Sequence, residues 1–403
     1  MNSNQNRIYS LDSLRAWLML LGIVYHGGYF TYSYIDEDSF ARLVFYFITE
    51  VVHSFRMPLF FVLSGFLILL FYKKKGIRKT VENRFARIVI PFVAAMVFLM
   101  PFKKYACNVY ASVVNGNTVL YSIQNNLNIK SFIPETTDYL WFLVYLTWFI
   151  GCFLFIIYVK ARLLLGHDKI LYFFNGIITS LPKRILFFTC LTLLGSLLTK
   201  SHDYYPSLTL IPDLKSFILF FTYFAIGVLL YKSQIDLKLF AIRCRQQILL
   251  GVILIICNRF LLSSSLGPTT FVKETIVAVL TILSTQLFLF GFLGLFVKYF
   301  SKPSAKARYI SNSSYWIYLI HMVIMPVIPI LLLNFCLPQV VVYFINVIVT
   351  FLISLVTYHY FVRPTFIGFI LNGRIASFKI EDDIKKNIKK GEEDKKYDDM
   401  VST

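Results

Sequence analysis

The sequence has 403 residues, of which 57% are apolar, 18% aromatic and only 15% charged, and its net charge at neutral pH is +19. A soluble globular protein carries about 25% charged residues, so this composition indicates a membrane protein. The positive charge does not indicate a nucleic-acid partner, because the basic residues stand between apolar runs and form no contiguous basic face. The six cysteines stand singly, with no Cys-x-x-Cys pair and no histidine at metal-ligand spacing, so no metal site is expected.

Apolar runs recur along the chain as far as residue 362, and most are about 20 residues long, the length that crosses the hydrocarbon layer of a membrane. The sequence therefore predicts an all-α polytopic membrane protein. We expect about ten transmembrane helices, at residues 11–31, 43–72, 84–102, 139–159, 185–200, 213–231, 246–262, 274–298, 313–334 and 339–362. The second run is too long for one perpendicular crossing and contains Pro58, so it fits an interfacial helix that leads into a kinked span.

The distribution of lysine and arginine predicts the orientation, because cytoplasmic loops hold the excess of these residues. With the N-terminus inside, most of the 40 basic residues fall in cytoplasmic segments, so both termini are expected in the cytoplasm. We expect one transmembrane domain over residues 1–376 and a charged, disordered cytoplasmic tail over residues 377–403. The longest external segment, 103–138, can cover a polar substrate or serve only as a connector.

The first predicted span carries two ionisable groups, Arg15 and His26, and such groups normally face a bundle interior or a wet cavity. Their spacing returns to nearly the same helix face, about 16 Å further along the axis. His26 suits a general base that takes a proton from an attacking hydroxyl group, because histidine exchanges its proton near neutral pH. A core histidine bonded to a neighbouring helix fits the same position. Asp12 precedes Arg15 by one turn and is expected to pair with it.

Two further groups of charged residues follow. Glu50, His53 and Arg56 share part of a helix face near the external surface, where they can contact an acceptor or simply reach the membrane interface. Arg84 and Arg87 stand three residues apart at the cytoplasmic start of the third span. Two guanidinium groups at a helix N-terminus suit the phosphates of coenzyme A, and ordinary anchoring by positive charge explains them nearly as well.

Arg259 lies on the outer half of the seventh predicted span, and His321 lies in the middle of the ninth. Each needs a partner inside the bundle. Arg259 can bind the second carboxylate of a dicarboxylic acyl group such as succinyl. If the chain transfers an acyl group, we expect Arg259 and His321, together with His53 and Arg56, to contact the acceptor or the acyl group.

Four segments carry a family resemblance through their order and spacing: Leu11-Asp12-Ser13-Leu14-Arg15-Ala16 with His26, the run from His53 to Phe66, Arg84-Phe85-Ala86-Arg87 before Pro91, and Leu140-Trp141-Phe142-Leu143. Together they resemble the acyltransferase-3 family of membrane acyltransferases over most of the chain. Within that family, residues 314–321 and 363–374 look most like the enzymes that succinylate periplasmic glucans.

This resemblance implies a ten-helix fold, an acyl-CoA donor that enters from the cytoplasm as a co-substrate, and a carbohydrate acceptor on the other face. It also implies that Arg15 and His26 form the active-site pair and that Arg84 and Arg87 bind the donor. Trp141 joins the candidate contacts to the acceptor or acyl group. The family often has a histidine directly before its Leu-Trp-Phe-Leu motif, whereas this chain has Tyr139, which leaves a proton-transfer role there in doubt.

Two classes of function are open. The first is an O-acyltransferase of a bacterial inner membrane that moves a succinyl or acetyl group from cytoplasmic acyl-CoA to an extracytoplasmic glucan. Another cell-surface polysaccharide, a lipid or a protein is the alternative acceptor. The second is a glycan or small-molecule transporter without acyl-transfer chemistry, although no convincing internal repeat supports it. We expect no permanently bound cofactor and no nucleic acid. The expected partners are membrane lipid, acyl-CoA, the glucan, and proteins of glycan synthesis or export.

Overall fold

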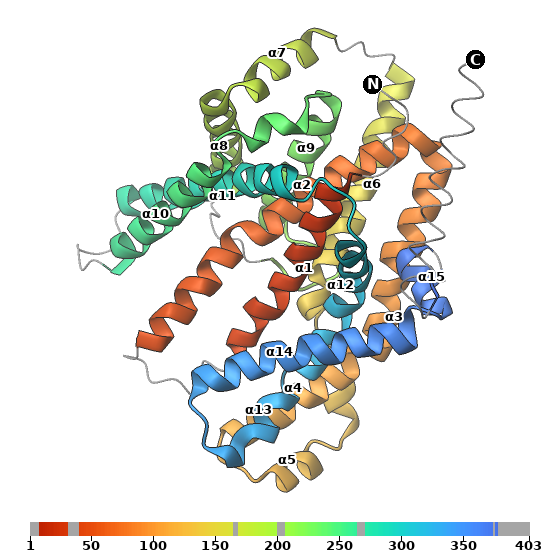
Figure 1. Ribbon diagram of the computed structural model, residues 1–403, viewed down its shortest axis with the longest axis vertical. Helices are drawn as coiled ribbons and strands as arrows, with labels where there is room; N and C mark the ends of the chain where they lie inside the picture. The colour runs from red at the N-terminus through yellow and green to blue at the C-terminus, as the bar shows by residue number, and fades with distance from the viewer. Residues whose placement is uncertain are drawn as a thin grey trace.

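A computed structural model describes residues 8–30, 40–163, 168–199, 206–263, 271–373 and 375–377. Within these ranges every regular element is a helix (Figure 1), which confirms the all-α class. Apart from Ser377, the predicted tail at 377–403 lies outside the described residues, so its disorder stays a prediction.

The helices follow one another with short connections. The α-helices are α1 (Tyr9–Tyr29), α2 (Phe40–Arg84), α3 (Ile90–Phe98), α4 (Met100–Val114), α5 (Val119–Asn125), α6 (Trp141–Leu163), α7 (Asp168–Thr179), α8 (Leu181–Thr199), α9 (Leu214–Lys232), α10 (Cys244–Ser263), α11 (Phe271–Tyr299), α12 (Ala305–Ile324), α13 (Val327–Leu332), α14 (Gln339–Thr357) and α15 (Phe366–Asn372). The short 3-10 helices are η3 (Ile129–Phe132), η4 (Asp138–Leu140), η5 (Leu237–Ala241) and η6 (Leu333–Phe335), and the π-helices are η2 (Phe85–Val89) and η7 (Tyr358–Val362).

Among the described residues, six helical segments are long and apolar enough to cross a membrane, or seven if a bent pair counts as one span. They are Phe47–Phe98, Asp138–Val159, Leu214–Lys232, Cys244–Leu261, Val272–Tyr299 and Gln339–Val362, and the bent pair is Ala305–Ile324 with Val327–Phe335. The predicted second and third spans fall together in the first of these segments. The spans predicted at 11–31 and 185–200 correspond to α1 and α8, which are helical but are not among the candidates. The count of ten and the orientation of the termini stay predictions.

The long helix α2 breaks at Gly76, and the kink that the sequence suggests at Pro58 stays a prediction. Gly76 has φ +77°, a conformation that glycine adopts without steric cost, whereas Pro58 lies inside continuous helix. The break lies among charged residues after the apolar run ends, so the chain turns there toward Arg84 and α3. Pro58 costs α2 one internal hydrogen bond but does not interrupt it.

Helices α2 and α9 approach each other closely through two glycines. A Cβ atom added at Gly65 would lie 2.0 Å from the carbonyl oxygen of Phe224, and one at Gly227 would lie 1.9 Å from that of Val62. Small residues allow such backbone contact between membrane helices, where tight packing replaces the hydrophobic driving force. The glycine of the Leu-Ser-Gly-Phe segment is therefore explained by helix packing.

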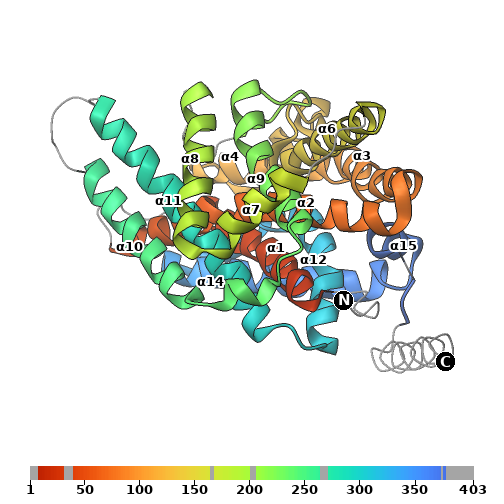
Figure 2. The ribbon, with the colours of Figure 1, turned by 90° about the horizontal axis from the view of Figure 1, so that it is seen from above.

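Helix α1 lies in the middle of the bundle (Figure 1, Figure 2) and packs against α2, α11, α12 and α14. Aromatic rings fill its contact with α2 and α11. The centroid of Phe292 lies 4.8 Å from that of Trp17 and 4.5 Å from that of Phe55. In contrast, α10 and α11 extend together to one edge of the molecule in both views. The polar residues of α1 therefore face neighbouring helices, as intramembrane ionisable groups normally do.

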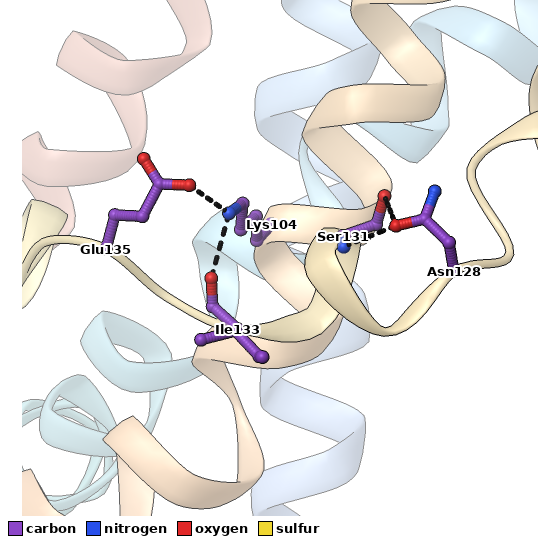
Figure 3. A network of polar contacts seen from close by, with 5 residues as sticks. All are labelled: Lys104, Asn128, Ser131, Ile133 and Glu135. Carbon is purple, nitrogen blue, oxygen red and sulfur yellow. Dashed lines mark hydrogen bonds and ion pairs between the residues drawn. The ribbon is translucent and has the colours of Figure 1, made fainter.

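The predicted external segment 103–138 is folded into helical turns and fastened back onto α4 (Figure 3). Lys104 Nζ donates to Glu135 Oε1 at 2.6 Å and to the carbonyl oxygen of Ile133 at 2.8 Å. Asn128 Oδ1 accepts from the backbone N–H of Ser131 at 3.0 Å and so caps η3. These contacts hold the segment near the start of α6, where Tyr139 directly precedes the Leu-Trp-Phe-Leu motif.

Candidate active site

Two histidines from distant parts of the chain face each other near the end of α1. The ring centroids of His26 on α1 and His321 on α12 lie 5.3 Å apart. On the other side, Tyr25 stacks on His53 of α2 with centroids 5.4 Å apart, and the Arg56 guanidinium carbon lies 5.1 Å from the centre of the Tyr25 ring. The structure thus brings together four residues that the sequence singled out, which we call the histidine cluster: His26, His53, Arg56 and His321.

A glycine on α1 leaves room for the Arg56 side chain. The Nη1 atom of Arg56 would lie 3.0 Å from a Cβ atom added at Gly22, one turn before His26. A larger residue at this position would press on the guanidinium group. The absence of a side chain at Gly22 therefore lets Arg56 lie directly against the helix that carries His26.

The hydrogen bonding of His321 defines its tautomer. His321 is 1% exposed, and its Nδ1 lies 2.7 Å from the carbonyl oxygen of Tyr318. A carbonyl oxygen only accepts, so Nδ1 carries the proton and Nε2 carries a lone pair. That Nε2 is buried without a hydrogen-bond partner, and so is Nδ1 of His26. Two unsatisfied nitrogens therefore belong to the two histidines that face each other, and buried polar atoms of this kind call for an explanation.

Tyrosines lock the start of α6 to α12 beside this pair. The hydroxyl of Tyr139 donates to the backbone carbonyl oxygen of Leu319 at 2.6 Å. The hydroxyl of Tyr318 donates to the backbone carbonyl oxygen of Tyr139 at 2.8 Å. The Tyr139 ring meets His321 edge-on with centroids 5.6 Å apart. Because its hydroxyl proton is engaged by a carbonyl oxygen, Tyr139 serves to hold the two helices together in this structure.

The sequence did not single out Lys103 and Asp138, which form a partly buried ion pair next to the cluster. Lys103 extends from α4 and is 11% exposed, and Asp138 directly precedes Tyr139. The positive charges of Lys103 and Arg56 both act on His26. Asp138 has φ +44°, an uncommon backbone conformation for a residue other than glycine. The available sequence signals were a lysine at the end of an apolar run and an acid two residues before the family motif.

Three arginines gather near the beginning of α1, and we call them the arginine cluster: Arg15, Arg84 and Arg87. Their charges act on one another. Arg15 pairs with Asp12 at 3.7 Å, as the sequence predicts. Arg84 Nη2 donates to the carbonyl oxygen of Leu67 at 3.4 Å, while its Nε is buried without a partner. Close packing of like charges with an unsatisfied donor is an arrangement that an anion would stabilise.

The arginine Arg87 also ties the end of the chain to this cluster. Its Nη2 donates to the carbonyl oxygen of Asn372 at 3.2 Å, at the C-terminus of α15. The hydroxyl of Tyr315 on α12 donates to the backbone carbonyl oxygen of Arg87 at 2.9 Å. Helices α12 and α15 therefore both set the position of Arg87.

Not all predicted site residues come together in one place. Arg15 and His26 share α1, but their separation of about 16 Å along the axis puts one in each cluster. Trp141 packs among aromatic rings, with its centroid 5.2 Å from Tyr145 and 5.3 Å from Phe220. Arg259 is exposed on α10, which packs mainly against α11 at the edge of the molecule. In the part of the chain that the structure describes, no group of three His, Cys, Asp or Glu side chains could hold a metal ion.

Comparison with known proteins identifies the family. A family described as an acyltransferase domain matches residues 8–359, which is nearly the whole described chain and includes both clusters. The chain belongs to the acyltransferase-3 family. The domain runs from the start of α1 to η7, so α15 lies just beyond it.

Curated relatives match over shorter stretches. The chain is 28% identical over 194 residues to "Glucans biosynthesis protein C" of Salmonella schwarzengrund, a match that covers 45% of this chain and 50% of the relative. It is 31% identical over 145 residues to the protein of the same name from Shigella dysenteriae serotype 1, covering 35% of this chain and 36% of the relative. The chain thus spans half or less of the length of these relatives. The comparison with solved structures gave no match.

Proposed function

We propose that this membrane acyltransferase moves an acyl group, succinyl in preference to acetyl, from cytoplasmic acyl-CoA to hydroxyl groups of an extracytoplasmic glucan. The observation that carries the proposal is the histidine cluster, in which His26 faces His321 and is acted on by the positive charge of Arg56 inside an acyltransferase domain. The glucan and the succinyl group come from the names and resemblance of the relatives, which are glucan biosynthesis proteins.

In this proposal His26 is the general base. The acceptor oxygen forms a bond to the thioester carbonyl carbon while its proton moves to His26. The carbon–sulfur bond then breaks, and the proton passes to the departing sulfur, so the products are an ester and free coenzyme A. Arg56 stabilises the negative charge that develops on the carbonyl oxygen, an effect that is large in a site from which water is excluded. Direct transfer is favoured over an acyl-enzyme, because no Gly-x-Ser-x-Gly elbow is present in the sequence.

The arginine cluster is proposed to bind the phosphates of the donor. Guanidinium groups suit phosphate oxygens because they offer paired donors in a fixed plane. The pantetheine arm is long and flexible, so it can run along α1 from Arg15 and bring the thioester to His26. We further propose that the enzyme acts in a bacterial inner membrane, beside lipid and proteins of glycan synthesis or export.

Release of coenzyme A tests this proposal. Purified protein is given succinyl-CoA or acetyl-CoA, with and without a glucan acceptor, and free thiol is measured. We expect acceptor-dependent release that is faster with succinyl-CoA. The His26→Gln variant should be about 10²–10⁴-fold slower, the usual contribution of a positioned general base.

Several outcomes would decide against parts of this proposal. Equal rates for wild type and a folded His26→Gln variant would exclude His26 as the base. Faster release with acetyl-CoA than with succinyl-CoA would show that the transferred group is acetyl. Release with a lipid or protein acceptor but not with glucan would mean that the acceptor is not a glucan, and no release under any condition would exclude these coenzyme A thioesters as donors.

A further inference from the structure

The two unsatisfied nitrogens of the histidine cluster point to one missing hydrogen bond. Nε2 of His321 must accept, because the proton of that ring is on Nδ1 and is given to the Tyr318 carbonyl oxygen at 2.7 Å. Nδ1 of His26 is the other buried nitrogen without a partner. The two ring centroids are 5.3 Å apart. Nδ1 of His26 can therefore donate a hydrogen bond to Nε2 of His321, either directly or through one water molecule.

The two rings also differ in burial. His321 is 1% exposed, so substrate cannot reach it without passing its neighbours. His26 is only partly buried although its Nδ1 is fully buried, which leaves its Nε2 as the polar atom that substrate can reach. His321 therefore stands behind His26 with respect to the site.

We propose that His321 is a positioning residue that orients the catalytic His26: its Nε2 accepts a hydrogen bond from Nδ1–H of His26. The order of contacts is the Tyr318 carbonyl oxygen, His321, His26 and then the acceptor hydroxyl. With its proton held on Nδ1, His26 presents the lone pair of Nε2 to that hydroxyl. A base whose tautomer is set by a third group is a recurring device in catalysis by histidine.

The surrounding structure holds His321 in place for this role. Two hydrogen bonds, at Tyr318 and Leu319, connect Tyr139 to α12 just before His321, and the Tyr139 ring lies edge-on to it. Asn346 Nδ2 on α14 donates to the carbonyl oxygen of Met325 at 3.1 Å, directly after α12. The part of α12 that carries His321 is thereby tied to the residues before α6 on one side and to α14 on the other. This inference rests on the proposed role of His26 as the base.

Two substitutions at His321 separate positioning from packing. In His321→Gln, Oε1 lies near the place of Nε2 and can still accept from His26. In His321→Asn, a donor to the Tyr318 carbonyl oxygen can remain but the acceptor is lost. We expect kcat to fall at least tenfold in His321→Asn and less in His321→Gln, with KM for both substrates unchanged within about threefold. In a His26→Gln background, His321→Asn should cost nothing further, because residues that act as a unit are not additive.

A spectroscopic measurement reads the tautomer without relying on activity. The chain has six histidines, so nitrogen-15 histidine labelling gives a small spectrum, and the signal lost in His26→Gln assigns that ring. We expect His26 to carry its proton on Nδ1 in the wild type and to lose this preference in His321→Asn. A proton on Nε2 in the wild type, or equal losses of kcat from His321→Asn in both backgrounds, would overturn the proposal. If His26→Gln keeps wild-type activity while the Nδ1 tautomer is observed, the pairing stands and the proposed function fails.

Discussion

At the scale of single residues, the arginine side chains Arg56 and Arg259 differ in their surroundings. Arg56 lies against Gly22 and over the Tyr25 ring, within electrostatic range of His26. Arg259 is exposed on α10, away from both clusters. From the sequence alone, Arg259 was the candidate for binding a second carboxylate, because the sequence shows which residues lie inside a span but not which helices lie beside it. In the structure, Arg56 and Lys103 are cations whose charges act on His26.

Because Arg56 lies in the histidine cluster and Arg259 does not, substitutions at these two arginines form a matched test. Arg56→Gln should lower kcat/KM by about 10²-fold, because a charge that stabilises the developing oxyanion is removed. Arg259→Gln should change kcat/KM and the preference for succinyl-CoA over acetyl-CoA by less than twofold. Initial rates of coenzyme A release with each donor test both. A loss of succinyl preference in Arg259→Gln alone would return that residue to the site.

At the scale of helices, glycine decides how closely two spans pack. Gly227 brings α9 against the backbone of α2 at Val62, less than two turns after Arg56, so the contact also supports the part of α2 that carries the histidine cluster. Gly151 on α6 is the matched control, because a Cβ atom there meets nothing within 4 Å. The sequence marks both simply as glycines inside apolar helices, and only the neighbouring backbone distinguishes them.

Gly227→Ala should therefore destabilise the fold while Gly151→Ala should not. A Cβ atom 1.9 Å from the Val62 carbonyl oxygen must push α9 away from α2, and overpacking of this kind costs about 1–3 kcal/mol or more. Alanine at position 151 should be neutral or slightly stabilising, because it favours helix by about 1 kcal/mol over glycine. Thermal unfolding midpoints of the purified variants in detergent measure both. Equal midpoints would show that the two helices separate without cost.

At the scale of the whole molecule, the end of the chain returns to its beginning. Arg87 and Asn372 are 285 residues apart in sequence and joined by a hydrogen bond. Gly373 follows with φ +73°, and a Cβ atom there would lie 1.9 Å from Nη2 of Arg87. The short helix α15 thus belongs to the arginine cluster although it lies beyond the matched acyltransferase domain.

Gly373→Ala should displace Arg87 and raise KM for acyl-CoA several-fold while leaving kcat nearly unchanged, since the histidine cluster lies at the other end of α1. Gly116→Ala is the control: its φ is +90°, so alanine meets the same backbone strain, but a Cβ atom there meets nothing within 4 Å. Steady-state kinetics with varied acyl-CoA measures both. A change in kcat without a change in KM would place α15 outside the donor site.

Much of the architecture was available from the sequence. Apolar runs of spanning length predict helices because, in a membrane, a helix satisfies its own backbone hydrogen bonds. Each predicted span coincides with helix among the described residues. Ionisable groups inside these runs also identified His26, His53, Arg56 and His321 one by one, since burying such a group without purpose is costly.

What the sequence by itself determined about this protein is its helical membrane class, its family and a short set of candidate residues, because each depends on local composition and order. The tertiary structure alone decided that Arg15 and His26 belong to two clusters, that Lys103 and Asp138 join one of them, and that His321 stands behind His26. Side chains on helices far apart in the chain meet according to helix packing. That packing depends on backbone contacts such as Gly65 against Phe224, which no local pattern encodes.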